Sequence, residues 1–290
     1  FFTTGNPDLK QQTSNTLSAR YTFTNTLKGR SFFANVYLQQ ANNYVANATY
    51  IASKDSALNT GDTLYKGAQL TKPVNLDGYL SLRSFLTYAA PLAFIKSNIN
   101  LNTGFTYAKT PGIVNYASSI TNNYTYSGGA VVSSNISEYI DFNVSYNINY
   151  NVARNTVQQQ ANNNYTMQTA GLQLNLLSKK GWFIQNDVNN ISYSGLSSGF
   201  NQNYWLWNAA IGKKFLKKQA AELKLSVFDL LRQNRSISRN VTESYIEDVQ
   251  NQVLTQYFLL TFSYKLKNFG APPVNNQKGN RKREASGAGF

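Results

Sequence analysis

The sequence contains no cysteine and no histidine. Disulfides, thiolate or imidazole metal sites, and catalytic sites of the Ser–His–Asp or Cys–His type are therefore excluded. Apolar residues never run continuously for the roughly eighteen positions that a transmembrane helix needs. Acidic residues are scarce, with 13 Asp and Glu against 27 Lys and Arg, and no paired-carboxylate spacing stands out. We therefore expect no bound cofactor and no enzymatic activity.

The abundant residues are aromatic or polar without charge, and they alternate. In YIDFNVSYNINYNV, residues 139–152, every second residue from Ile140 to Val152 is apolar and the residues between are polar. Period-two alternation places the two sets on opposite faces of a β-strand, one facing apolar surroundings and the other water. These thirteen residues span about 44 Å and, tilted by about 40°, climb roughly 33 Å. Strands of soluble proteins usually stop at about five or six residues, so this length indicates a strand that crosses a bilayer.

The same alternation recurs along the chain and predicts eleven strands. They are expected at residues 13–27, 31–45, 75–88, 97–109, 122–134, 138–152, 165–177, 182–193, 203–215, 221–231 and 250–266. The connectors between them are alternately short and long, with long ones at 46–74, 110–121, 153–164, 194–202 and 232–249. Outer-membrane barrels have short periplasmic turns and longer extracellular loops. We predict an all-β, up-and-down antiparallel transmembrane β-barrel; a soluble sandwich that buries the apolar rows between two sheets is the alternative.

Charged residues within the predicted strands fall on the polar side of the alternation. Four of them are predicted to face the lumen: Arg20, Arg83, Asp141 and Asp187. We expect these four side chains to bridge to neighbouring strands or to a plug rather than to contact a solute. Asp77 also lies on the polar side of its predicted strand. Asp229 and Lys213 break the rule, but both lie near strand ends, where the cost of charge in lipid falls.

Aromatic residues cluster near the ends of the predicted strands, as girdles at two membrane interfaces require. The predicted girdle comprises Tyr124, Tyr126, Trp205 and Trp207 on the long-loop side, and Trp182 and Tyr264 on the short-turn side.

Basic residues are concentrated on the short-turn side. Fifteen Lys and Arg fall there or in the C-terminal segment, against three acidic residues, which leaves a charge of about +12. Contact with anionic headgroups of outer-membrane lipid explains such a rim. We do not expect nucleic-acid binding, because the bases do not interleave with exposed aromatic residues along one groove. Residues 271–290 are rich in Pro, Gly, Lys and Arg, and we predict that they form a disordered periplasmic tail after a barrel portion at 1–270.

Two stretches resemble a known family. GNPDLKQQTSNTLSARYTF (5–23) resembles the Gly-Asn-Pro-x-Leu-Lys loop and following strand of TonB-dependent receptors, with Gln11 and Gln12 in place of the commoner Pro-Glu. FDLLRQNRSISRNVTESYIEDVQNQVLTQYFLLTFSYKLKNFG (228–270) resembles the closing hairpin of the related Bacteroidota-type outer-membrane β-barrel family. The resemblance implies a barrel of about 22 strands, a plug, a TonB-contacting segment and a signal peptide. We interpret the chain as the C-terminal half of such a barrel, with the other strands and the plug upstream.

The resemblance implies transport: loops capture a scarce nutrient, and plug movement driven through TonB admits it to the cell. We place candidate ligand-facing residues in the two longest loops: Tyr50, Lys54, Asp55, Tyr65, Lys66, Arg232, Arg235, Arg239 and Glu243. The alternative is a barrel that does not transport but serves as a platform for a partner such as a surface lipoprotein. Both interpretations place the protein in the cell outer membrane.

Overall fold

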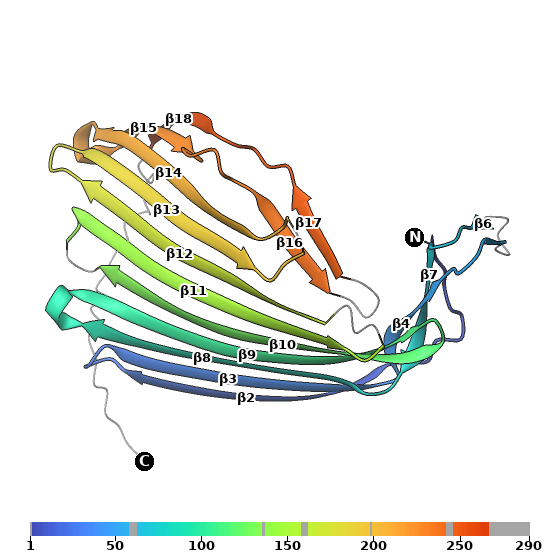
Figure 1. Cartoon of the computed structure of the whole chain (residues 1–290). Helices are drawn as coiled ribbons and strands as arrows, with labels where there is room; N and C mark the ends of the chain where they lie inside the picture. Colours follow the sequence, from blue (N-terminus) through green and yellow to red (C-terminus); the bar gives the residue numbers. More distant parts are fainter. Residues whose placement is uncertain are drawn as a thin grey trace, which may run out of the picture.

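The structure, a computed structural model, describes residues 2–57, 63–134, 137–157, 162–197, 199–241 and 246–266. Within these ranges the chain forms a curved wall of eleven antiparallel strands (Figure 1). In spatial order they are β2 (Thr13–Asn25), β3 (Arg30–Asn42), β8 (Tyr79–Leu92), β9 (Ser97–Val114), β10 (Ala117–Ser134), β11 (Ile140–Asn155), β12 (Asn163–Leu177), β13 (Trp182–Ser194), β14 (Gln202–Phe215), β15 (Ala221–Phe228) and β18 (Tyr257–Tyr264). Each corresponds to a predicted strand, and the all-β antiparallel fold is confirmed.

The wall is not closed. Among the described residues, β2 pairs with β3 alone and β18 with β15 alone, so the eleven-stranded wall has two free edges. This arrangement is compatible with part of a larger barrel. No helix in the described ranges is long and apolar enough to cross a membrane.

The register of the strands sorts the side chains into an apolar and a polar face. Between β10 and β11, Tyr124 lies opposite Val152 and Val132 opposite Val144, whereas Thr125 lies opposite Asn151. Successive residues point to opposite faces of a sheet, so the first two pairs share one face and the third lies on the other. We call the apolar face the outer face and the polar face the inner face.

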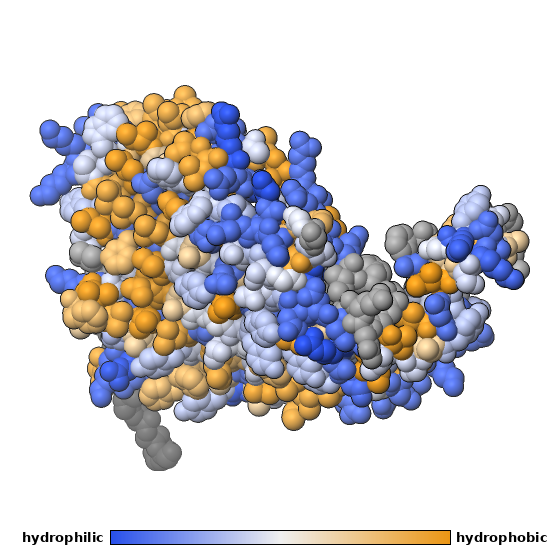
Figure 2. Space-filling model, in the orientation of Figure 1, coloured by the Kyte–Doolittle hydropathy of each residue, from blue (hydrophilic) through white to orange (hydrophobic). Residues whose placement is uncertain are grey.

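Apolar side chains on the outer face remain exposed. Leu17 is 68%, Val144 46% and Phe258 66% accessible, because no second layer packs on this face within the part of the chain that the structure describes. These fractions exclude the sandwich alternative, in which the same rows would be buried. Figure 2 shows apolar side chains gathered toward the left and lower margins of the view and polar ones over its middle.

Connectors at one end of the wall, at the left of Figure 1, are short turns over 26–29, 93–96, 178–181 and 216–220.

At the other end the predicted loop at 110–121 is wrong. There β9 and β10 pair as far as Val114 and Ala117 and turn at Asn115 and Tyr116, with φ of 49° and 69°. Two residues with positive φ make a turn whose twist matches that of the flanking strands.

The connector between β3 and β8 also contains strands. They are β4 (Tyr44–Ile51), β5 (Ser56–Ala57), β6 (Thr63–Leu64) and β7 (Gln69–Leu76), paired as β4–β7 and β5–β6. The strand predicted at 75–88 therefore begins too early, because β7 ends before Gly78 (φ 98°) and the wall strand begins at Tyr79. Asp77 lies in this turn and accepts the backbone N–H of Asn43 (2.8 Å), so its predicted place within a wall strand is wrong.

Strand β4 ties two neighbouring connectors together. It pairs in parallel with the end of β9, with Ala48 opposite Ile113. The backbone N–H of Asn115 donates to the carbonyl of Thr49 (3.0 Å), so the β9–β10 turn is bonded to the β4–β7 hairpin.

The N-terminal segment lies along the edge of β7. Strand β1 (Phe2–Thr3) pairs with β7 in parallel, and the Asn6 side chain donates to the carbonyl of Pro73 (2.9 Å). The backbone N–H of Lys10 donates to the side chain of Asn75 (2.6 Å). The Gly-Asn-Pro segment is therefore at the long-connector end of the wall.

The connector between β15 and β18 folds back over the inner face (Figure 1). It contains a hairpin of β16 (Ser236–Val241) and β17 (Ile246–Asn251). Ile237 of the hairpin and Leu196 and Tyr204 of the wall side are buried, and the Tyr204 hydroxyl donates to the carbonyl of Arg235 (3.0 Å).

At the base of the connector, Asp229 is 2% exposed and accepts the backbone N–H of Gln233 (2.8 Å). Its charge at the strand end is therefore stabilised by hydrogen bonds in a buried turn.

A buried ion pair holds this hairpin against the wall. Arg239 and Asp248 lie opposite each other on β16 and β17, and their side chains are both 2% exposed. The guanidinium donates to both carboxylate oxygens (2.6 Å each) and also to the carbonyl of Gly195 (3.1 Å). Its Cζ atom lies 5.3 Å from the ring centre of Tyr165 on β12. We call Arg239, Asp248, Gly195 and Tyr165 the hairpin clamp.

The exposure of the outer face predicts a sharp difference between adjacent residues. Val144→Arg should destabilise the intact membrane-inserted protein by about 2–4 kcal/mol, because it places a charge in hydrocarbon. Asn143→Arg, one residue away on the inner face, should cost far less. Urea unfolding in lipid vesicles measures the difference, and heat-modifiable migration on detergent gels checks insertion. Equal tolerance of the two substitutions would show that the faces are wrongly assigned.

The hairpin clamp predicts that removing one charge frees the hairpin. Arg239→Gln leaves the Asp248 carboxylate buried without its partner, which costs about 3–5 kcal/mol. Hydrogen exchange of the β16–β17 amides in the intact protein should accelerate accordingly, while exchange of β11 stays unchanged. Arg235→Gln removes an exposed arginine at the base of the same hairpin and serves as the control.

The same clamp predicts a pH dependence. The guanidinium of Arg239 lowers the pKa of Asp248 from 3.8 to about 2. A depressed carboxyl pKa stabilises the folded form above the unfolded pKa, and that contribution is lost as pH falls from about 4 toward 2. The hydrogen-exchange rate of the hairpin amides should therefore rise across this pH range, because the hairpin opens more often. Arg239→Gln should lack this rise, and a wild-type-like pH profile in that variant would contradict the clamp.

Candidate functional site: a polar hollow on the inner face

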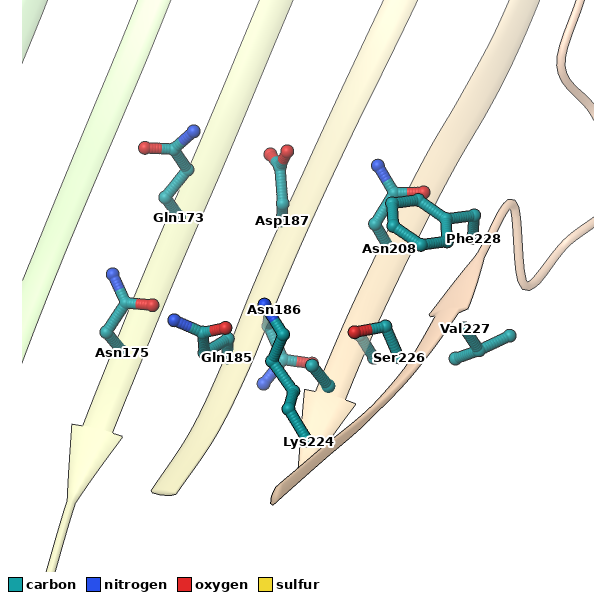
Figure 3. A pocket seen from close by; sticks show the side chains of 12 residues that line it. Gln173, Asn175, Gln185, Asn186, Asp187, Asn208, Lys224, Ser226, Val227 and Phe228 are labelled. Carbon is teal, nitrogen blue, oxygen red and sulfur yellow. The ribbon is translucent and has the colours of Figure 1, made fainter. Parts of the chain in front are cut away.

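Polar side chains from four neighbouring strands surround a shallow hollow on the inner face (Figure 3). Its volume is about 290 Å³. The inward side chains that line it are Gln173 and Asn175 from β12, Gln185 and Asp187 from β13, Asn208 from β14, and Lys224, Ser226 and Phe228 from β15.

Strand register places these side chains in rows. Gln173 lies opposite Asp187, and Asp187 lies opposite Asn208, so the three form one line across β12, β13 and β14. The next line of inward residues contains Asn175 opposite Gln185. Because inward positions recur every second residue, each strand contributes from one to three of these side chains.

The side chains of the hollow are mainly hydrogen-bonding groups. Four carboxamides supply both donors and acceptors, and Asp187 and Lys224 supply one charge of each sign. The Asp187 carboxylate accepts a hydrogen bond from Asn189 (2.7 Å). Phe228 at the upper edge stacks on Tyr257 with ring centres 4.6 Å apart. Such a surface suits water and uncharged or zwitterionic polar solutes.

The opposite face of the same strands has the opposite character. A shallow groove on the outer face is lined by apolar side chains, including Ile184, Ile211, Leu225 and Phe258. Water-compatible and lipid-compatible surfaces are therefore separated by the thickness of one sheet.

The four predicted lumen charges all lie on the inner face, but the structure does not bring them together. Arg20 lies over the ring of Phe33, with 5.6 Å from Cζ to the ring centre. Asp141 accepts hydrogen bonds from Ser134 (3.0 Å) and Asn175 (3.4 Å). Arg83 lies opposite Tyr37, and Asp187 lines the hollow.

The predicted loop residues are divided between two hairpins. Those on the β4–β7 side are Tyr50, Lys54, Asp55, Tyr65 and Lys66. There Tyr50 contacts the ring of Tyr116 (4.7 Å), Asp55 accepts the backbone N–H of Lys66 (2.7 Å), and Tyr65 is 65% exposed. These residues lie far from the hollow, beyond the end of the wall (Figure 1).

The other group lies around β16. Arg232 donates to Gln256 (2.8 Å) and Arg235 to Gln202 (2.7 Å), and both arginines are exposed. Arg239 belongs to the buried hairpin clamp, so its guanidinium is already occupied. Glu243 lies outside the described residues.

The predicted girdle residues lie on the outer face. Trp182 and Tyr264 occupy the short-turn ends of β13 and β18 and are 50% and 53% exposed. Tyr124, Trp205 and Trp207 lie nearer the other end of their strands, whereas Tyr126 lies in the middle of β10. The indole N–H of Trp207 donates to the outward Asn186 (3.3 Å), which satisfies a polar group on the apolar face.

Sequence reasoning missed the carboxamides of the hollow. Gln173, Asn175, Gln185 and Asn208 carry no charge, and polar alternation assigns them to the inner face without distinguishing them from the many other inward Asn and Gln. Pairing between strands would have been needed to place them side by side.

Comparison with known proteins matches this architecture. The model of the outer membrane protein beta-barrel family matches residues 119–264, half of the chain, from within β10 to the end of β18. Searches of curated proteins and of solved structures found no match. With an exposed apolar outer face, a polar inner face and a family match over half its length, the chain belongs to the outer membrane protein beta-barrel family.

Proposed function

We propose that this chain forms the C-terminal part of the wall of a TonB-dependent-receptor-like barrel that imports a polar nutrient across the outer membrane. The observation that carries the proposal is the inner face, whose polar side chains continue across the strands and surround a hollow above which no hydrophobic layer packs in the described ranges. A face of this kind suits a water-filled lumen.

The free edges support a barrel larger than the described wall. Backbone N–H and C=O groups that are unpaired in hydrocarbon cost several kcal/mol each, so only closed barrels cross a membrane as strands. β2 is thirteen residues long, and only one of its edges is paired within the described residues. Further strands from the same protein would close the barrel, as the resemblance to TonB-dependent receptors implies.

The connectors at the long end support capture of a solute from outside. One of them folds inward over the polar face above the hollow, and another extends beyond the wall as the β4–β7 hairpin. In this proposal the exposed residues of the two hairpins meet the nutrient first, and the carboxamides of the hollow then replace part of its water shell.

A platform that does not transport is the second candidate. The observation that favours it is the bonding of the connectors: the β4–β9 pairing joins two of them, and the hairpin clamp fixes another to the wall. A stiff surface of this kind would present fixed contacts to a partner lipoprotein.

Labelling of a single thiol tests transport against the platform. The chain has no cysteine, so Gln185→Cys places the segment's one thiol in the hollow. If import is coupled to TonB, its labelling by a membrane-impermeant maleimide in cells should change several-fold when a protonophore collapses the inner-membrane gradient, because plug movement alters access. Ser56→Cys, exposed on the β4–β7 connector, should label at the same rate under both conditions. Labelling of position 185 that ignores the protonophore would favour the platform.

A further inference from the structure

Lysines gather at the short-turn end of the wall, on two neighbouring turns, at the adjoining end of β14 and directly after β18. We define the lysine cluster as Lys179, Lys180, Lys213, Lys214, Lys217, Lys218 and Lys265. Backbone hydrogen bonds join the turns: Lys214 N–H donates to the carbonyl of Gly181 (2.8 Å), and Lys265 N–H donates to the carbonyl of Ala220 (2.8 Å). The seven ammonium groups are therefore carried by one continuous piece of the rim.

Few acidic groups balance this charge. Glu222 lies directly opposite Lys214 on the inner face of the β14–β15 pair. Glu138 and Asp141 line a small pocket together with Lys214, so three acidic residues adjoin the seven lysines. Elsewhere on the same rim, the described turns carry Lys28, Arg30 and Lys96. Positive charge is thus concentrated at one sector of the rim and is not spread evenly around it.

The outward part of the cluster lies where the apolar face ends. Lys213 and Trp182 lie opposite each other just beyond the outward pair Ile184 and Ile211. The Lys213 ammonium is 5.0 Å from the indole ring centre, and Trp182 is half exposed. An indole and a lysine whose stem runs along apolar surface are the pair that membrane interfaces favour.

Apolar side chains are interleaved with the lysines. In the run KKFLKK, residues 213–218, Leu216 is 60% exposed, and Phe215 lies on the outer face with its ring 6.5 Å from that of Phe262. Leu266, after Lys265, is 78% exposed. Apolar side chains exposed between ammonium groups are unfavourable in water. The acyl chains of a lipid whose phosphate binds the ammonium groups would cover these apolar side chains.

We propose that the lysine cluster, with Trp182 and Phe215, is a binding site for the headgroup of an anionic phospholipid in the periplasmic leaflet. The phosphate lies among the ammonium groups of the turns, and the acyl chains run along the outer face over Phe215 and Ile211. The site does not depend on whether the barrel transports.

Lipid titration of the full-length protein tests this site. The protein is placed in phosphatidylcholine nanodiscs containing increasing fractions of phosphatidylglycerol, and native mass spectrometry measures the lipids that remain bound. Lys213→Gln/Lys217→Gln/Lys218→Gln should lower the preference for phosphatidylglycerol by at least about fivefold, since each lysine near an anionic surface contributes about that factor. The matched control Lys28→Gln/Arg30→Gln/Lys96→Gln removes the same charge from other turns and should keep the preference.

Further arms separate the alternatives. Lys→Arg at positions 213, 217 and 218 retains the charge and should retain the lipid preference, which distinguishes a lost site from a misfolded rim. Inorganic phosphate should not displace the lipid, because the acyl chains contribute to binding. The proposal would be overturned if the control triple variant lost its preference for phosphatidylglycerol to the same extent, or if free phosphate displaced the lipid. Tighter binding of a single-stranded oligonucleotide than of lipid would also overturn it.

Discussion

Contact with two different solvents on the two faces of one sheet governs this structure. A single layer of strands has no core in the usual sense, and its buried apolar residues are few and lie mainly where connectors pack on the wall, as at Leu196, Tyr204 and Ile237. Stability of the wall itself must come from backbone pairing and from the removal of the outer rows from water into lipid. The same division makes the inner face available for solutes, since every inward position is free to be polar.

The connectors show how the long end is built on this wall. Two of the described connectors there form hairpins: the β4–β7 hairpin pairs with the end of β9, and the β16–β17 hairpin folds inward over the polar face. A buried ion pair holds the inward hairpin in place. In a soluble core the desolvation of such a pair offsets much of its stabilisation, but the pair fixes the connector in one position. The polar inner surface that remains uncovered lies below it, toward the short turns.

Much of the wall could be predicted from sequence because a period of two fixes both the strand and its faces. Arg20, Asp141 and Asp187 were placed on the inner face by parity alone, and register in the structure agrees. The β9–β10 extension could not be predicted, since Pro111 and Gly112 indicate a loop. Pro111 lies between the last pairing of β9 with β8, at Lys109, and its first pairing with β4, at Ile113. On that side Pro111 therefore has no ladder bond to complete, and proline is tolerated. The hollow and the hairpin clamp depend on contacts between segments that are distant in sequence, such as Tyr165 with Arg239, and no local pattern encodes them.

The parallel pairing of β4 with the end of β9 limits how this part of the molecule can move. Ala48 opposite Ile113 joins two connectors that would otherwise be independent, and the Asn115 side chain adds a bond from the backbone N–H of Ile51 (2.8 Å). A mechanical load on either connector is shared by both and passes into the longest strands of the wall. Opening at this side would therefore require both connectors to hinge as one body.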